Sequence, residues 1–306
     1  MSDITDAALP MTATLFQRLP SNPIIAVGAD AGIGNNVNGP SPIRAPDWLP
    51  HRLGRYYLYF AHHIGDTIRL AYADDLEGRW TLHRPGALAL SESLFDHHIA
   101  SPDVHVDEAR REIRLYYHGA YAPGREYQYE RLAVSADGVH FQARPPILGG
   151  YYWRLFQWGG YWYGLIMPGR LVRSPDGIGP FEFGPLLFDP SMRHSAVHVV
   201  GDTLLVFYSR AGDTPERILF CRIELRGDWR TWSASGSVTV LQPEHDYEGV
   251  REPLVPSKRG EVFGPVRELR DPGVLVEDGS LYLFYSVAGE SGLGIAKASL
   301  DSVLAL

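Results

Sequence analysis

A short unit of strands and turns recurs five times along this chain, and this recurrence restricts the possible folds more than any other feature of the sequence. Each unit contains an aromatic-rich, strand-like segment, then a polar hairpin and a further strand-like segment. The aromatic-rich segments are residues 56–60, 113–117, 161–165, 204–208 and 281–285. Self-similarity of this kind is typical of a repeat architecture, in which each repeat is one structural unit.

The loops that follow the aromatic-rich segments are alike in units one, four and five. They read IGDT at 64–67, AGDT at 211–214 and AGES at 288–291. A third strand, a turn closed by an aromatic residue and a fourth strand then follow in most units. A lone four-stranded sheet leaves apolar residues exposed on both faces, and radial stacking of such sheets covers them. The sequence therefore predicts an all-β, five-bladed β-propeller.

The fifth unit lacks a fourth strand after Leu300, whereas the N-terminal phrase 16–25 resembles the fourth-strand phrase 141–147. We therefore expect the N-terminal segment to close the last blade. Under this interpretation residues 1–306 form a single domain. The expected blades are residues 35–92, 93–149, 150–189, 190–242, and 243–306 together with 14–27.

Charge and cysteine content exclude some classes of partner. The formal net charge of −8 and the pI near 5.8 argue against a nucleic-acid or anionic membrane surface. A single cysteine, Cys221, permits no disulfide within the chain. The N-terminal stretch lacks the basic start of a signal peptide, and no apolar run reaches membrane-spanning length. We expect a cytoplasmic protein with no nucleic-acid or membrane partner; the sequence leaves its oligomeric state open.

The first residues of each innermost strand should surround a pocket at the propeller axis. These stretches are residues 39–44, 101–105, 151–156, 193–198 and 269–274. Three arginines fall at comparable places in successive blades, namely Arg154, Arg193 and Arg270. Asp103, His194 and Asp271 also fall at comparable places in their blades. We expect all six side chains near the axial pocket.

Several short motifs resemble glycoside hydrolase family 43 and its five-bladed relatives that act on furanosides and β-mannosides. They are Pro-Asp-Val at 102–104, Asp-Pro at 271–272 and the Ser-x-Asp-Gly turns at 135–138 and 174–177. The resemblance implies a pocketed sugar-processing enzyme with a general base from blade one, an orienting Asp from blade two and a general acid Glu from blade three. Such carboxyl pairs protonate the leaving group and activate water.

Only some of these catalytic roles have a matching residue in this chain. Asp103 matches the orienting Asp, but blade one has Gly39 where the resemblance implies an Asp, and blade three has no Glu-Gly on its inner strand. Glu248 lies in a Glu-Gly phrase within the long segment before blade five, which can reach over the pocket. The candidate catalytic residues are therefore Asp103, Glu248 and Asp271.

Six further residues are candidates for substrate binding: Arg154, Arg193, His194, Arg270, Trp153 and His118. Each functional role has a structural alternative. Asp103 could cap a turn, Glu248 could be a solvated loop residue, and Trp153 could pack within its blade. His118 belongs to a histidine-rich neighbourhood without a recognisable metal-ligand spacing, so we expect no metal and no cofactor.

Three functions follow from these residues. The first is a glycoside hydrolase acting on a small oligosaccharide or glycan, with the three arginines favouring an acidic sugar. The second is a lyase on a uronate, in which His194, Tyr152 or His118 abstracts a proton. The third is a non-catalytic carbohydrate-binding propeller.

Overall fold

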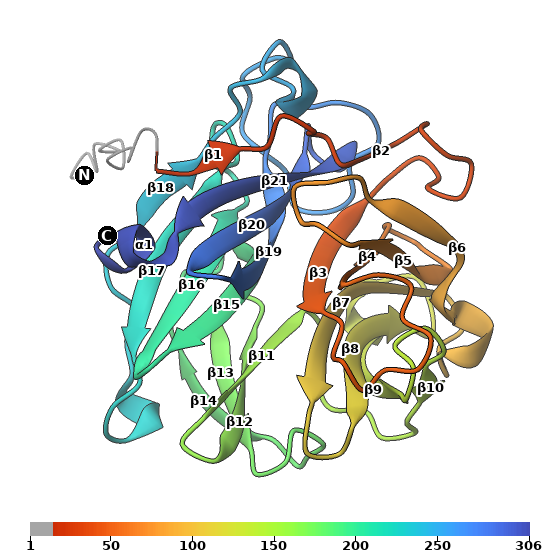
Figure 1. Cartoon of the computed structure of the whole chain (residues 1–306). Coiled ribbons are helices and arrows are strands. Elements are labelled where there is room, and N and C mark those ends of the chain that lie inside the picture. Colours follow the sequence, from red (N-terminus) through yellow and green to blue (C-terminus); the bar gives the residue numbers. More distant parts are fainter. Residues whose placement is uncertain (1–14) are drawn as a thin grey trace.

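The computed structural model describes residues 15–306, and its strands form five antiparallel sheets arranged around one axis (Figure 1). Four sheets have four strands each, and the sheet formed by the two ends of the chain has five. The five-bladed propeller predicted from the repeats is confirmed.

Each blade runs outward from the axis in chain order. Blade one comprises β3 (Asn38–Arg44), β4 (Tyr56–Ala61), β5 (Thr67–Ala73) and β6 (Thr81–Ala89). Blade two comprises β7 (His98–Asp107), β8 (Glu112–Ala120), β9 (Gln128–Ser135) and β10 (Gln142–Ala143). Blade three comprises β11 (Trp153–Trp158), β12 (Tyr161–Ile166), β13 (Arg170–Ser174) and β14 (Glu182–Leu186).

The last two blades follow the same order. Blade four comprises β15 (Met192–Val200), β16 (Thr203–Arg210), β17 (Ile218–Glu224) and β18 (Val238–Leu241). Blade five comprises β19 (Arg270–Glu277), β20 (Ser280–Val287) and β21 (Gly292–Ser299), joined by β1 (Gln17–Arg18) and β2 (Ile25–Ala26). The helical elements are η1 (Leu90–Glu92), η2 (Arg125–Tyr127), η3 (Trp229–Thr231), η4 (Asp246–Glu248) and α1 (Leu300–Leu304). None of these described helices is long and apolar enough to cross a membrane.

The aromatic-rich segments form the second strand of each blade, and they join neighbouring blades. Tyr59 of β4 packs edge-on against Phe141 of blade two with ring centroids 5.7 Å apart, and its hydroxyl donates to the Gly138 carbonyl at 2.6 Å. Tyr116 of β8 donates to the Gly177 carbonyl of blade three at 2.9 Å. The aromatic body fills the space between blades, while the hydroxyl satisfies a buried turn carbonyl. This is why aromatic strands and Ser-x-Asp-Gly turns recur together.

The N-terminal segment closes the ring, as the sequence predicted. Both β1 and β2 pair antiparallel with β21, with Gln17 opposite Lys297 and Ile25 opposite Leu293. Phe16 is buried edge-on against Phe207 of blade four, with ring centroids 6.0 Å apart. The first and last strands of the described residues, β1 and β21, therefore share one sheet.

The inner strands are irregular in their first residues, at the end of the propeller axis where these strands begin. Four of them, β3, β7, β15 and β19, show a register shift within their first residues. Gly39, Ser101 and Asp271 have positive φ values of 60°, 49° and 47° at these places. A bulge of this kind redirects the side chains beside it. Arg193 and His194 lie within the register shift of β15, so this bulge, rather than regular strand alternation, directs their side chains toward the pocket.

Deletion of residues 1–27 should lower the melting temperature by about 5 °C or more, because it removes β1 and β2 and leaves β21 as an unpaired edge over an exposed apolar surface. Differential scanning calorimetry of the deletion variant against the full chain measures this. Deletion of residues 1–14, which retains both strands, is the control. Equal melting temperatures for the full chain and the 1–27 deletion would contradict the closure.

Candidate functional site

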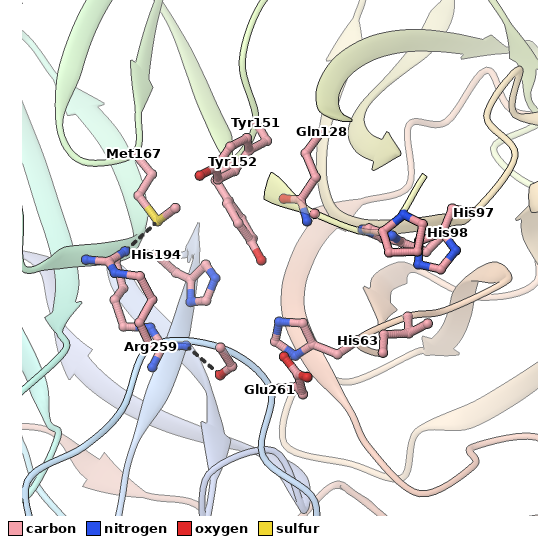
Figure 2. A pocket seen from close by; sticks show the side chains of 15 residues that line it. His63, His97, His98, Gln128, Tyr151, Tyr152, Met167, His194, Arg259 and Glu261 are labelled. Atoms are coloured by element: carbon pink, nitrogen blue, oxygen red, sulfur yellow. Dashed lines mark hydrogen bonds between the residues drawn. The ribbon is translucent and has the colours of Figure 1, made fainter. Parts of the chain in front are cut away.

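A pocket of about 300 Å³ opens at the end of the axis where the inner strands begin (Figure 2). Residues from blades one to four and from the long segment before blade five line it: His63, Ile64, His97, His98, Pro123, Gly124, Gln128, Tyr151, Tyr152, Met167, Arg193, His194, Arg259, Gly260 and Glu261. Among the described residues, Glu261 is the only carboxylate in this lining. The polar groups that face the pocket are therefore mainly imidazole, phenol and guanidinium groups.

His194, on β15, pairs with a buried carboxylate on β19. Its Nδ1 contacts Oδ1 of Asp271, and the other Asp271 oxygen accepts a hydrogen bond from Ser286 Oγ at 3.3 Å. Burial, followed by the positive charges of Arg193 and His63, lowers the pKa of His194 well below its ordinary value. His194 is therefore neutral at neutral pH. With Nδ1–H directed at Asp271, its other ring nitrogen is available to accept a proton.

His63, in the loop after β4, forms a second pair of the same kind. Its Nδ1 lies 2.6 Å from Oε2 of Glu290, and its backbone amide donates to Asn36 Oδ1 at 3.0 Å. Burial would raise the pKa of Glu290, but the charge and hydrogen bond of His63, together with Arg270 and Asn36, outweigh it and lower that pKa. Glu290 is therefore ionised at neutral pH, and its negative charge lies against the His63 ring.

The rings of Tyr152, His194 and His63 point into the same space (Figure 2). Tyr152 has a positive φ of 62° and lies between two imidazoles, with ring centroids 4.4 Å from His118 and 4.6 Å from His194. Burial raises the pKa of Tyr152 to about 12, so its hydroxyl remains a hydrogen-bond donor at neutral pH. A half-buried aromatic residue held at positive φ is strained, and such strain clusters at functional sites.

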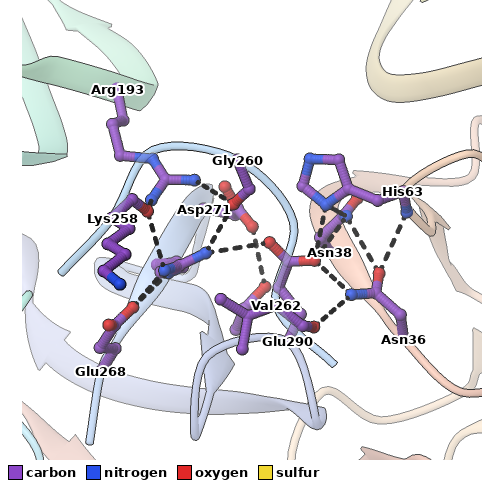
Figure 3. A network of polar contacts seen from close by, with 12 residues as sticks. Asn36, Asn38, His63, Arg193, Lys258, Gly260, Val262, Glu268, Asp271 and Glu290 are labelled. Carbon is purple, nitrogen blue, oxygen red and sulfur yellow. Dashed lines mark hydrogen bonds and ion pairs between the residues drawn. The ribbon is translucent and has the colours of Figure 1, made fainter. Parts of the chain in front are cut away.

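A buried ion-pair network lies directly behind this lining (Figure 3). The Arg270 guanidinium, which is fully buried, donates to Glu268 at 2.6 Å and to Glu290 at 3.2 Å. Arg193 donates to Glu216 at 3.2 Å and to the Lys258 carbonyl at 2.9 Å.

Both arginines also donate to the Gly260 carbonyl, Arg270 at 3.1 Å and Arg193 at 3.2 Å. The network thus fixes the segment that carries Arg259 and Glu261 at the pocket edge. As the sequence suggested, the long segment before blade five reaches the pocket.

The structure does not bring the three predicted arginines together. Arg193 lines the pocket, Arg270 lies behind it, and Arg154 donates to the Ser195 carbonyl at 2.8 Å in a separate axial cavity of about 160 Å³. Buried carboxylates surround the first two arginines, so their charges are compensated within the protein. The expected surplus of positive charge is therefore absent from this part of the site.

Asp103 lines that second cavity rather than the pocket. Its Oδ2 accepts hydrogen bonds from the Leu155 amide at 2.7 Å and from His105 Nε2 at 2.8 Å. Burial would raise the pKa of Asp103, but His105 and Arg154 outweigh it and lower that pKa. The carboxylate therefore links blade two to blade three. This structural role resembles the turn capping that the sequence offered as the alternative for Asp103.

Three other predicted residues also lie outside the pocket lining. Glu248 accepts from Arg18 Nε at 2.7 Å and from the Glu244 amide at 2.8 Å, and it closes a capping box at η4. Trp153 is fully buried and donates to the Gly150 carbonyl, so it packs within its blade. His118 is buried behind Tyr152 and His98.

Sequence reasoning did not single out His63, Glu290 or Arg259. The similar loops of units one and five contained a signal for the pair His63 and Glu290. Glu290 occupies the acidic position of AGES, and His63 immediately precedes IGDT. Among residues 15–306, no group of three or more His, Cys, Asp or Glu side chains is arranged to hold a metal ion.

The buried histidines predict that stability falls in mild acid. Burial, with His97 and His63, lowers the pKa of His98 to about 4, whereas an unfolded histidine titrates near 6.5. As the pH falls from about 6.5 to about 4, the unfolded state gains a proton that folded His98 does not, so the free energy of unfolding decreases. His98→Gln should reduce this loss, measured by urea unfolding at pH 7 and pH 5. The exposed His51→Gln is the control, and an unchanged pH dependence in His98→Gln would contradict the assignment.

Comparison with known proteins finds solved structures of the same fold and a relative by sequence. No family model matches the chain. The β-1,2-mannobiose phosphorylase from Listeria innocua superposes with a TM-score of 0.66 at 12% identity, over 95% of this chain and 98% of that one. A glycoside hydrolase family 43 enzyme from Xanthomonas citri gives a TM-score of 0.60 at 14% identity, over 86% and 88% of the two chains.

The relative by sequence is an uncharacterized protein of Acanthamoeba polyphaga mimivirus. It is 36% identical over 320 residues, which cover 92% of this chain and 89% of the viral protein. Identity at this level over nearly the whole of both chains reflects a shared structure and not a local motif. The chain therefore belongs to the family of this viral protein, and its fold is the five-bladed β-propeller of glycoside hydrolase family 43 and related glycosidases and phosphorylases.

Proposed function

We propose that this protein is a carbohydrate-active enzyme that cleaves a glycosidic bond of a small glycan in the axial pocket. The observation that carries the proposal is the presence of two histidine–carboxylate pairs, His194–Asp271 and His63–Glu290, on one pocket. The structural neighbours add support, because glycoside hydrolases and a phosphorylase share this fold. Each pair sets an imidazole, which can give or take a proton, beside a buried carboxylate that orients it.

His194, which is neutral, acts as the general base, and His63 acts as the general acid. In hydrolysis, His194 takes a proton from water as its oxygen attacks the anomeric carbon, and Asp271 stabilises the imidazolium that forms. His63 gives its proton to the departing oxygen, and Glu290 stays ionised beside it. Tyr152, whose ring packs against His194, donates a hydrogen bond to sugar oxygens.

A neutral sugar fits this site better than an acidic one. The preference for an acidic sugar depended on three converging arginines, but Glu216, Glu268 and Glu290 surround Arg193 and Arg270. Calorimetric titration with matched neutral and uronic oligosaccharides, at low and high salt, compares the two classes. Tighter binding of the uronic series that weakens with salt would favour the acidic sugar instead.

His194→Gln and Asp271→Asn should each lower kcat by about 100-fold or more, because each removes part of the general base. The assay is product release from a panel of p-nitrophenyl glycosides and oligosaccharides, with and without inorganic phosphate, which distinguishes hydrolysis from phosphorolysis. The exposed His140→Gln is the control, and melting temperatures check folding. Binding of a glycan without turnover by the wild type would support the non-catalytic alternative.

A uronate lyase is the second candidate, favoured by the nature of the groups in the pocket. Histidine and tyrosine face the pocket where a glycosidase commonly presents two carboxylates, and Arg193 and Arg259 lie in its lining. A lyase would use the same His194 to abstract the proton beside the uronate carboxyl. Its product contains a carbon–carbon double bond, so new ultraviolet absorbance during digestion of uronic oligosaccharides identifies it.

A further inference from the structure

Ile64 adopts a backbone conformation that its side chain disfavours. Its φ is 53°, in the left-handed region, where β-branched residues are rare because Cβ and its two substituents crowd the backbone. Among the described residues 15–306, it is the only β-branched residue with a positive φ. Glycine or asparagine adopts this conformation at a lower cost.

The surrounding contacts impose this conformation on the loop. The His63 amide donates to Asn36 Oδ1 at 3.0 Å, the Ile99 amide to the Gly65 carbonyl at 2.9 Å and the Leu90 amide to the Asp66 carbonyl at 2.7 Å. A Cβ at Gly65 would lie 2.7 Å from the His62 carbonyl oxygen, so the next position is also constrained. The backbone at position 64 is therefore fixed whichever side chain it carries.

Packing within the protein does not account for an isoleucine at this position. The Ile64 side chain is 56% exposed, so most of its apolar surface remains in water. The equivalent position of the like loop in blade five is Ala288, which has a similar φ of 47° but is 4% exposed. Blade one thus carries a larger, strained and exposed side chain where blade five has a small buried one.

The location of Ile64 supplies a reason for it. Ile64 lines the pocket and directly follows His63, the proposed donor of a proton to the leaving group. Under the proposed function, the leaving-group oxygen lies next to His63, which gives it a proton. An exposed apolar side chain beside the proton donor therefore meets the leaving group.

We propose that Ile64 is a specificity-determining residue that binds an apolar leaving group, such as an alkyl chain, of the glycoside. This inference rests on the proposed function for the direction in which the substrate lies. The backbone strain is retained because the side chain contacts the ligand, and functional sites commonly store strain in this way. Pro123, also in the lining, adds apolar surface to the pocket.

The test compares Ile64→Gly with Leu94→Gly. Leu94 is a matched control because it too has a positive φ, 61°, and an exposed apolar side chain, 47%, but it does not line the pocket. The probes are methyl and octyl glycosides of β-mannose, β-xylose, β-glucose and β-galactose, and calorimetry measures their affinities. We expect at least one octyl glycoside to bind the wild type about ten-fold more tightly than its methyl counterpart. Ile64→Gly should lose this preference, and Leu94→Gly should keep it.

The melting temperature provides the second readout. Both glycine variants should melt at or above the temperature of the wild type, since each relieves strain at an exposed residue. A fall of more than about 2 °C in Ile64→Gly alone would show that packing retains the residue, and would overturn the proposal. So would the absence of any octyl preference in the wild type, or its survival in Ile64→Gly. The protein could show an octyl preference that depends on Ile64 and yet cleave none of the glycosides. That result would reject the proposed enzyme activity but support the role of Ile64 in binding.

Discussion

The buried guanidinium of Arg270 is the interaction on which the candidate site depends. A fully buried positive charge is tolerated only where carboxylates and carbonyls surround it, and Glu268, Glu290 and the Gly260 carbonyl do so here. Through these contacts one side chain joins the start of β19, the segment before blade five and the loop after β20. The position of Glu290, and through it the orientation of His63, follows from this charge.

The same network explains why histidines rather than carboxylates face the pocket. Glu216, Glu268 and Glu290 are paired with arginines behind the lining, and Asp271 is paired with His194. Glu290 and Asp271 contact the pocket histidines His63 and His194, so these two carboxylates reach the pocket through the imidazole rings. The fold is shared with glycosidases, but the chemistry of the pocket differs from the carboxylate pair that family resemblance implied.

The sequence predicted the fold well because the repeat is local. Each aromatic-rich segment, turn and loop can be recognised within about fifty residues, and the closing strand near Ile25 resembles its counterpart in blade two. The site depends on long-range pairing that spacing along the chain does not reveal. Arg154 and Arg193 hold comparable places in their blades, yet β15 has a bulge at Arg193 and β11 has none at Arg154, and the two side chains reach different cavities. Glu248 lies in a promising motif, but Arg18, 230 residues away, draws it into a structural contact.

The pairing of β1 and β2 with β21 has a consequence for the synthesis of the protein. Ile25 leaves the ribosome more than 250 residues before its partner Leu293. The blades can form one after another as they emerge, while the ring remains open until β21 has been made. During that time the apolar Phe16 and Ile25 lack the strand that covers them, so the nascent chain carries an exposed edge while the other blades are synthesised.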